Sequence, residues 1–241
     1  MTIPRVRRLV MAIGLILCCG CGCGKKEDKP PPKPPPPPPK EIAAVERLGG
    51  KVHVSPADKR RDRPRWTRVD LGNTSIGDAD LACLKDVGDI HILHLQNTII
   101  GDGALAHVVA LPDVKVLHLG YTGITDAGLA QLAGMAKLED LDLRGTKITD
   151  AGVAHLAKIG NLKRLRLDDT QLTDAAVPQL PKGLSMLYLD GTKVTDAVFP
   201  QLDAFGPLRK VGLRRSKITK EKAQEYANRC REQKRSLGLE Y

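Results

Sequence analysis

A threonine recurs at a nearly constant interval through the last three quarters of this chain, and this period constrains the fold more than any other feature. The interval is 24 residues in every case but one, where it is 22, and a serine takes the seventh place: Thr74, Thr98, Thr122, Thr146, Thr170, Thr192 and Ser216. A period of roughly 20 to 29 residues is typical of solenoids, in which each unit covers the apolar face of its neighbour. The sequence therefore predicts a stack of about seven similar units.

Apolar residues hold fixed places around each recurring threonine. The fifth and third residues before it are always Leu or Val, and because they lie two apart they face the same side of a short strand. The seventh and tenth residues after it are apolar in six units, which indicates one inward stripe on a helix. The eighth residue before it is also apolar, and Trp66 fills this place in the first unit.

Polar residues recur as well. We expect each recurring threonine to hydrogen-bond the backbone of its own or the next turn. An aspartate stands four residues after it in six units, often preceded by a threonine, as in Thr125-Asp126. Either side chain can cap the start of the helix that follows, and the carboxylate also suits the positive end of that helix. The pattern predicts a folding role for these residues rather than a catalytic one.

The unit LEDLDLRGTKITDAGVAHLAK, which starts at Leu138, resembles the leucine-rich repeat. It is most similar to the type of about 24 residues that carries Thr in place of the usual Asn or Cys. The resemblance covers about residues 66–220, and we place the repeats at 66–218. It implies an α/β, right-handed solenoid with a concave parallel sheet and convex helices. It also implies a protein-recognition scaffold rather than an enzyme, and many lipid-anchored bacterial proteins carry this repeat.

Segments on both sides of the repeats are expected to cap the array. In an N-terminal cap at 41–65, residues 41–48 are predicted to form a short amphipathic helix closed by two glycines, with a strand at 51–54. At the other end, residues 219–241 are predicted to form a capping helix and tail, in which Thr219 opens a helix that runs to about residue 235.

Two local features qualify this regular pattern. In the fifth unit, Pro178 and Pro181 are expected to interrupt the helix, because proline lacks a backbone N–H and clashes with the preceding turn. Cys83 and Cys230 lie in helical stretches beside apolar residues, which suits small buried side chains. A disulfide between them would have to cross most of the array, so we expect both to be free thiols.

The N-terminus has the features of a secretory signal. Basic residues precede an apolar run at 9–19, which is too short for the roughly 20 residues of a membrane-spanning helix. The run ends in four clustered cysteines and resembles the lipobox of bacterial lipoproteins, which implies a signal peptide at 1–20. Cys21, directly after a glycine, is favoured as the lipidated residue, with Cys19 second and Cys23 last. Metal binding or disulfides fit less well, because the cysteines lie too close together.

Residues 21–40 are rich in Lys and Pro and are expected to form a spacer without fixed structure relative to the repeats. Polyproline is stiff and extended, at about 3.1 Å per residue, which suits a stalk behind a lipid anchor. We therefore expect a protein secreted across the inner membrane and lipid-anchored at the cell envelope, on either the cell membrane or the outer membrane.

The formal net charge of +10 lies at the two ends of the chain. Residues 1–40 hold 8 basic and 2 acidic residues, residues 207–241 hold 11 and 4, and residues 41–206 hold 19 and 22. The basic C-terminal end, with Arg214 and Lys217, is an alternative binding surface for an anionic lipid or polysaccharide. Aromatic residues make up only 3% of the chain, which argues against a nucleic-acid partner, since that needs exposed aromatic side chains.

Residues six, four and two places before each recurring threonine are expected to point out of the concave sheet. They predict an adaptable, partly apolar surface that binds a protein or peptide, on a chain expected to be a monomer without a cofactor. The candidate binding residues are Ile92, His94, Val116, His118, Tyr121, Asp142, Arg166, Met186 and Tyr188.

Three of these side chains also suggest a different chemistry. His94, His118 and Asp142 are predicted to be lateral neighbours on successive strands, and two imidazoles with a carboxylate are a known zinc ligand set. A metal-assisted hydrolase is therefore a weaker hypothesis. It is disfavoured because an exposed row lacks an enclosed pocket and second-shell support, and because no catalytic motif stands in a fitting context.

Overall fold

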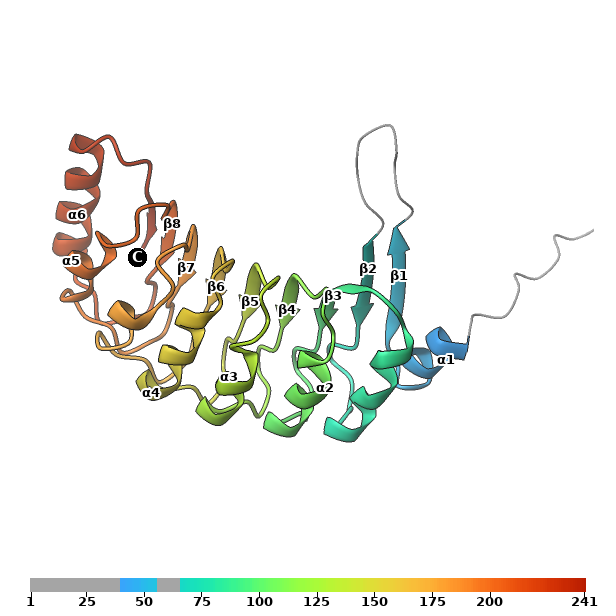
Figure 1. The fold of residues 1–241 in the computed structure, drawn as a ribbon. Helices are drawn as coiled ribbons and strands as arrows, with labels where there is room; N and C mark the ends of the chain where they lie inside the picture. Colours follow the sequence, from blue (N-terminus) through green and yellow to red (C-terminus); the bar gives the residue numbers. More distant parts are fainter. Residues whose placement is uncertain (1–39, 56–65) are drawn as a thin grey trace, which may run out of the picture. The chain divides into compact units, whose positions relative to one another are not determined.

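The computed structural model describes residues 40–55 and 66–241 (Figure 1). The expected signal peptide at 1–20, the spacer up to residue 39, and residues 56–65 lie outside the described residues, and so do the candidate lipidation sites Cys19 and Cys21. Within the described ranges, no helix is long and apolar enough to cross a membrane.

The described strands form one sheet in sequence order. Their bounds are β1 (Lys51–Ser55), β2 (Trp66–Asp70), β3 (Ile90–His94), β4 (Val116–His118), β5 (Asp140–Asp142), β6 (Arg164–Arg166), β7 (Met186–Tyr188), β8 (Lys210–Gly212) and β9 (Gly238–Glu240). Strands β2 to β8 are parallel and stand where the period places them, and β1 adds to β2 in the antiparallel sense. The terminal strand β9, which pairs with β8, was not predicted.

Short helical segments connect the strands and cover one face of the sheet, while the other face lies on the inner side of the curve (Figure 1). The α-helices are α1 (Lys40–Arg47), α2 (Leu105–Val109), α3 (Asp126–Leu132), α4 (Asp150–Val153), α5 (Val198–Leu202) and α6 (Lys220–Glu232). The 3₁₀ segments are η1 (Asp78–Asp86), η2 (Asp102–Ala104), η3 (Ala154–Lys158) and η4 (Val177–Gln179). The prolines interrupt the helix of the fifth unit, as predicted: Pro178 lies in the first turn of η4, and Leu180, which caps the segment, is extended ahead of Pro181.

The core consists of the aliphatic positions that the period selects. The strand residues five and three places before each recurring threonine, such as Leu93 and Leu95, are buried, and so are the paired helix positions, such as Leu129 and Leu132. Trp66 is the exception, since it is 38% exposed. It begins β2 opposite Ser55 of β1, ahead of a register shift, and it is partly exposed although its place in the period is apolar in every unit.

Each recurring threonine closes its own turn, as predicted. The hydroxyl of Thr98 donates to the carbonyl of Leu95 at 2.7 Å, and the same bond joins Thr122 to Leu119 at 2.6 Å. These hydroxyls are buried, so the bond satisfies a donor that water does not reach.

The recurring aspartates act differently from the prediction. Thr149 does cap its own helix by accepting the N–H of Ala151. Asp126 of the preceding unit, however, accepts the backbone N–H of Thr149 at 2.8 Å through Oδ1 and its hydroxyl at 2.6 Å through Oδ2. The same two bonds join the pairs Asp102–Thr125, Asp150–Thr173, Asp174–Thr195 and Asp196–Thr219. The carboxylates therefore fasten each unit to the next.

The C-terminal end is capped as expected. Thr219 accepts the N–H of Lys222 and opens α6, which ends at Glu232, three residues before the predicted end. Beyond it, β9 forms the last strand of the sheet. The carbonyl of Glu240 in this strand accepts the N–H of Leu213 at 2.7 Å. Cys83 and Cys230 are both free thiols, and Cys230 is buried.

Candidate binding face of the sheet

The open face of the sheet carries the side chains that alternate with the core residues along each strand. The parallel register brings His94, His118, Asp142, Arg166 and Tyr188 into one row across β3 to β7. The predicted lateral order of these residues is therefore confirmed. Their environments differ sharply from one end of the row to the other.

The two histidines form a compact neutral pair. Their rings are parallel within 3° and their centroids lie 4.4 Å apart. Nη2 of Arg68 lies 3.2 Å from Nδ1 of His94, and the His94 side chain is only 13% exposed. Burial, with help from His118 and Arg68, lowers the pKa of His94 to about 4, and burial also lowers the pKa of His118.

Asp142 is completely buried and is not a contact residue of this surface, contrary to the prediction. Both its carboxylate oxygens accept from Nε of Arg144 at 3.0 Å, and Nη1 of Arg166 lies 3.6 Å from Oδ2. Asp142 therefore orients two arginines. In residues 40–55 and 66–241, no group of three His, Cys, Asp or Glu side chains is placed to hold a metal ion.

Charges on the β5 to β9 half of the face are largely paired with one another. Arg164 donates to Asp140 at 2.9 Å. The ring of Tyr188 lies between the cations of Arg166 and Lys210, each 5.5 Å from its centroid. Asp168 is buried here, and burial raises the pKa of its carboxyl to about 6.

A shallow hollow of about 520 Å³ lies on this face at the N-terminal ends of β4 to β7. The predicted contact residues Val116 and Met186 line it on opposite sides. The ion pair between Asp140 and Arg164 lies between them, because these residues occupy the two intervening strands.

Tyr121 lies at the edge of the face, in the turn that follows β4. It is 49% exposed and has a left-handed backbone with φ of 58°. All seven units are left-handed at this place, which Asn, Asp and Gly adopt more readily than Tyr: Asn73, Asn97, Tyr121, Gly145, Asp169, Gly191 and Arg215. A Cβ on Gly145 would lie 2.3 Å from the Tyr121 ring, so this glycine leaves room for the ring.

Sequence reasoning missed two exposed apolar side chains on the same half of the array. Trp66, at the start of β2, is partly exposed. Ile99, directly after the recurring Thr98, is 76% exposed. In the other units the residue after the recurring Thr or Ser is Lys, Gln, Ser or Gly. An isoleucine at this place was therefore the sequence signal for an exposed apolar side chain.

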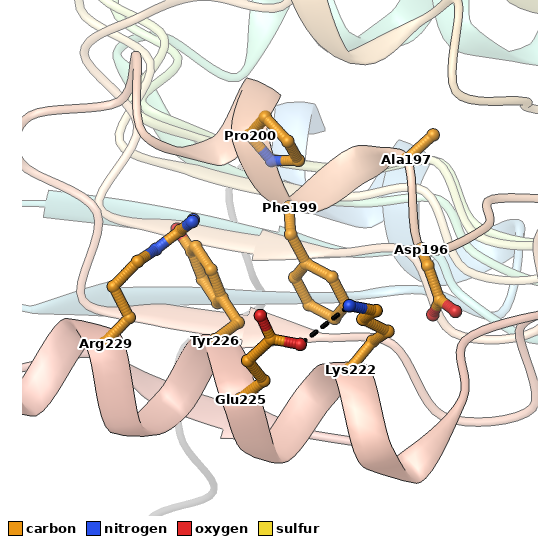
Figure 2. Close-up of a pocket in the computed structure, with 8 residues that line it drawn as sticks. All are labelled: Asp196, Ala197, Phe199, Pro200, Lys222, Glu225, Tyr226 and Arg229. Atoms are coloured by element: carbon orange, nitrogen blue, oxygen red, sulfur yellow. Dashed lines mark hydrogen bonds and ion pairs between the residues drawn. The ribbon is translucent and has the colours of Figure 1, made fainter.

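A second hollow of about 350 Å³ lies on the helical side, between α5 and α6 (Figure 2). Phe199 and Tyr226 stack at its floor with ring centroids 4.9 Å apart, and both are buried. Lys222 pairs with Glu225 at 2.8 Å, so these two rim charges satisfy each other (Figure 2). This hollow offers few free groups to a ligand.

The basic C-terminal end is less available than its composition indicates. Glu240 of β9 pairs with Lys210 at 2.7 Å and with Arg214 at 3.4 Å. Arg215 reaches Asp169 at 3.2 Å. Three of the cations expected to attract an anionic lipid or polysaccharide therefore already have acidic partners.

Comparison with known proteins gives one family match. The model described as "Leucine Rich repeat" matches residues 110–133 and 134–157. No curated protein matches the chain.

Several solved structures are similar. Internalin C2 from Listeria monocytogenes is 21% identical over 63% of this chain and 73% of its own, with a TM-score of 0.46. The octameric complex of Latrophilin 3, Unc5D and FLRT2 (LRR) gives 24% identity over 65% of this chain and 49% of the other, with a TM-score of 0.46. The PEPR1–AtPEP1 structure is 16% identical over 67% of this chain and 23% of its own, with a TM-score of 0.42.

The family match falls on two complete units in the middle of the array. The first contains β4 and α3, and the second contains β5 and α4. Together with the ordered parallel strands and the helical segments on their outer side, this match to two units shows an α/β solenoid of the leucine-rich-repeat type.

Proposed function

We propose that this chain is a non-enzymatic scaffold that binds a protein or peptide on the β2 to β4 half of the open sheet face. The observation that carries the proposal is a division of this face into two halves. The β5 to β9 half is occupied by ion pairs that satisfy one another, such as Arg164–Asp140 and Lys210–Glu240. The β2 to β4 half carries Ile92, Val116 and two neutral histidines beside the ion pair of Arg68 with Asp70.

Two aromatic side chains strengthen this assignment. Trp66 and Tyr121 are partly exposed at the borders of the same half, and Trp and Tyr are the residue types that most often dominate binding energy at interfaces. Tyr121 keeps a backbone conformation that is unfavourable for its residue type. A requirement for its ring at the surface accounts for its presence there.

Substitution on the two faces of the sheet tests the proposal. Ile92→Ser and Tyr121→Asn alter the proposed contact half, whereas Lys158→Ser alters an exposed residue on the helical side. The full-length protein is used to capture partners from envelope extract, and recovery is quantified by mass spectrometry. We expect a partner whose recovery falls at least about tenfold with either face variant and stays unchanged with Lys158→Ser. Equal recovery with all three variants would refute the location of the site.

We further propose that the protein is secreted and held at the cell envelope by a lipid on Cys21, with Cys19 as the alternative. The support is the basic and apolar N-terminal sequence followed by clustered cysteines. Mass spectrometry of the mature N-terminus in wild type and in Cys21→Ser identifies the modified residue. A mature chain that begins elsewhere and carries no lipid would refute the anchor while leaving the binding face untouched.

A further inference from the structure

The contact between Arg68 and His94 fixes the protonation state of the histidine. A guanidinium group has five N–H donors and no acceptor, and it keeps its proton in proteins. Because Nη2 of Arg68 lies 3.2 Å from Nδ1 of His94, that nitrogen must accept the hydrogen bond and carries no proton. The single ring proton of His94 is therefore on Nε2, and the imidazole is neutral.

Charges around the pair are balanced without a proton on either ring. Arg68 and Asp70 face the pair from β2, with Oδ2 of Asp70 3.9 Å from Nδ1 of His94. From the strands beyond β4, the facing groups are Asp140, Asp142, Arg144 and Arg166. These neighbours comprise three arginines and three aspartates, and each aspartate binds an arginine: Asp70 binds Arg68 at 3.1 Å, Asp140 binds Arg164 and Asp142 binds Arg144.

We propose that His94 and His118 form a proton-operated latch on the binding face, in which the neutral rings stack and hold Arg68, and proton uptake separates the rings and releases Arg68 from His94. A proton on Nδ1 of His94 replaces the acceptor with a second donor, so the bond from Arg68 is lost. Protonation of both rings would then place two like charges 4.4 Å apart, which favours separation.

The latch gives the binding half two states. In the neutral state the two rings carry no charge and the Arg68–Asp70 ion pair beside them is satisfied within itself, which suits an apolar partner. In the protonated state the half gains positive charge and the guanidinium of Arg68 keeps only Asp70 as a partner, which favours hydration over an apolar contact. Burial lowers the pKa of both histidines, so the change belongs to acidic solution. This use of the latch rests on the proposed function, whereas the latch itself is a property of the chain alone.

Side-chain NMR of ¹⁵N-labelled histidines in the full-length protein tests the latch without any partner. Ring signals are assigned with His94→Gln and His118→Gln, and circular dichroism at each pH reports whether the fold persists. At about pH 7.5 we expect His94 as the neutral tautomer with the proton on Nε2. On acidification we expect the stacking-dependent ring shifts of both histidines to disappear as His94 takes up its proton.

Two arginine variants separate the latch from a general effect of charge on this face. Arg68→Gln removes the contact, and we expect the pKa of His94 to rise by at least about half a unit. Arg164→Gln removes an arginine that pairs with Asp140, and we expect no comparable rise. The latch is refuted if His94 carries a proton on Nδ1 at neutral pH, if the rings stay stacked after protonation, or if Arg68→Gln leaves the titration unchanged. Failure of partner capture alone would refute only the proposed function.

Discussion

Removal of the Asp126 carboxylate tests how neighbouring units are held together. In Asp126→Ala, the N–H and hydroxyl of Thr149 lose their shared acceptor, at 2.8 Å and 2.6 Å. Hydrogen bonds to a charged group contribute about 1.5–3 kcal/mol each, but these groups are partly exposed and water replaces part of the loss. We therefore expect a decrease of about 2 kcal/mol in the free energy of unfolding.

Urea unfolding followed by far-UV circular dichroism measures this change. A body of about 200 residues is expected to have a slope near 2–3 kcal/mol per molar urea, so the midpoint should fall by about 0.7–1 M. Since stability in a solenoid depends on contacts between neighbouring units, the transition should also broaden.

Asp113→Ala is a matched control, because it removes an exposed aspartate that pairs with Lys137 of the next unit. Exposed ion pairs contribute little, so we expect no measurable change in its midpoint. The reasoning is refuted if Asp126→Ala unfolds at the same urea concentration as wild type, or if Asp113→Ala is destabilised as much.

Four further variants test the face itself. The pKa of Asp168 in the folded protein, about 6, lies above the unfolded value of 3.8, so its stabilising contribution is lost as pH rises from 4 to 6. Asp168→Asn should therefore raise the free energy of unfolding at pH 7 by about 1–3 kcal/mol and change little near pH 4. The pKa of His94 lies below its unfolded value of 6.5, so the free energy of unfolding should fall as pH drops from 6.5 to about 4. In urea unfolding at several pH values, His94→Gln should show a smaller fall. Gly145→Ala should destabilise the protein by more than about 1 kcal/mol, because φ is 62° and the new Cβ would collide with the Tyr121 ring. Tyr121→Asn should stabilise it by about 1 kcal/mol, and a midpoint that moves the other way would contradict the argument from backbone strain.

The sequence predicts the repeated part of this fold well, because each unit repeats the same local solution. Burial of Leu93 and Leu95 follows from their places relative to Thr98, and the lateral order of His94 and His118 follows from the equal spacing of the strands. These features depend only on the period. Features that depend on what lies beside a residue in the next unit were harder to predict.

The aspartates show the difference. Asp126 precedes a helix, so local reasoning favours a role in capping, yet its partner is Thr149, 23 residues away. Asp142 shares the alternation of surface residues but is buried beneath Arg144 and Arg166, and alternation alone does not report the size of neighbouring side chains. Strand β2 of the first unit also departs from the rest. It pairs with β1 in place of a strand from another repeat, and its Trp66 is left at the surface.

The bonds between units have a direction that bears on how such a chain can grow. Each aspartate binds the unit that follows it, and each threonine at a helix start receives the aspartate before it. Insertion of one whole unit, for example a second copy of residues 126–149, therefore supplies one new acceptor and one new donor pair and leaves every existing bond with a partner. Insertion of half a unit leaves an aspartate or a threonine at the junction without its partner. Gene duplication by complete periods thus meets no mismatch at the junctions, and the length of the array is open to change by evolution or by design.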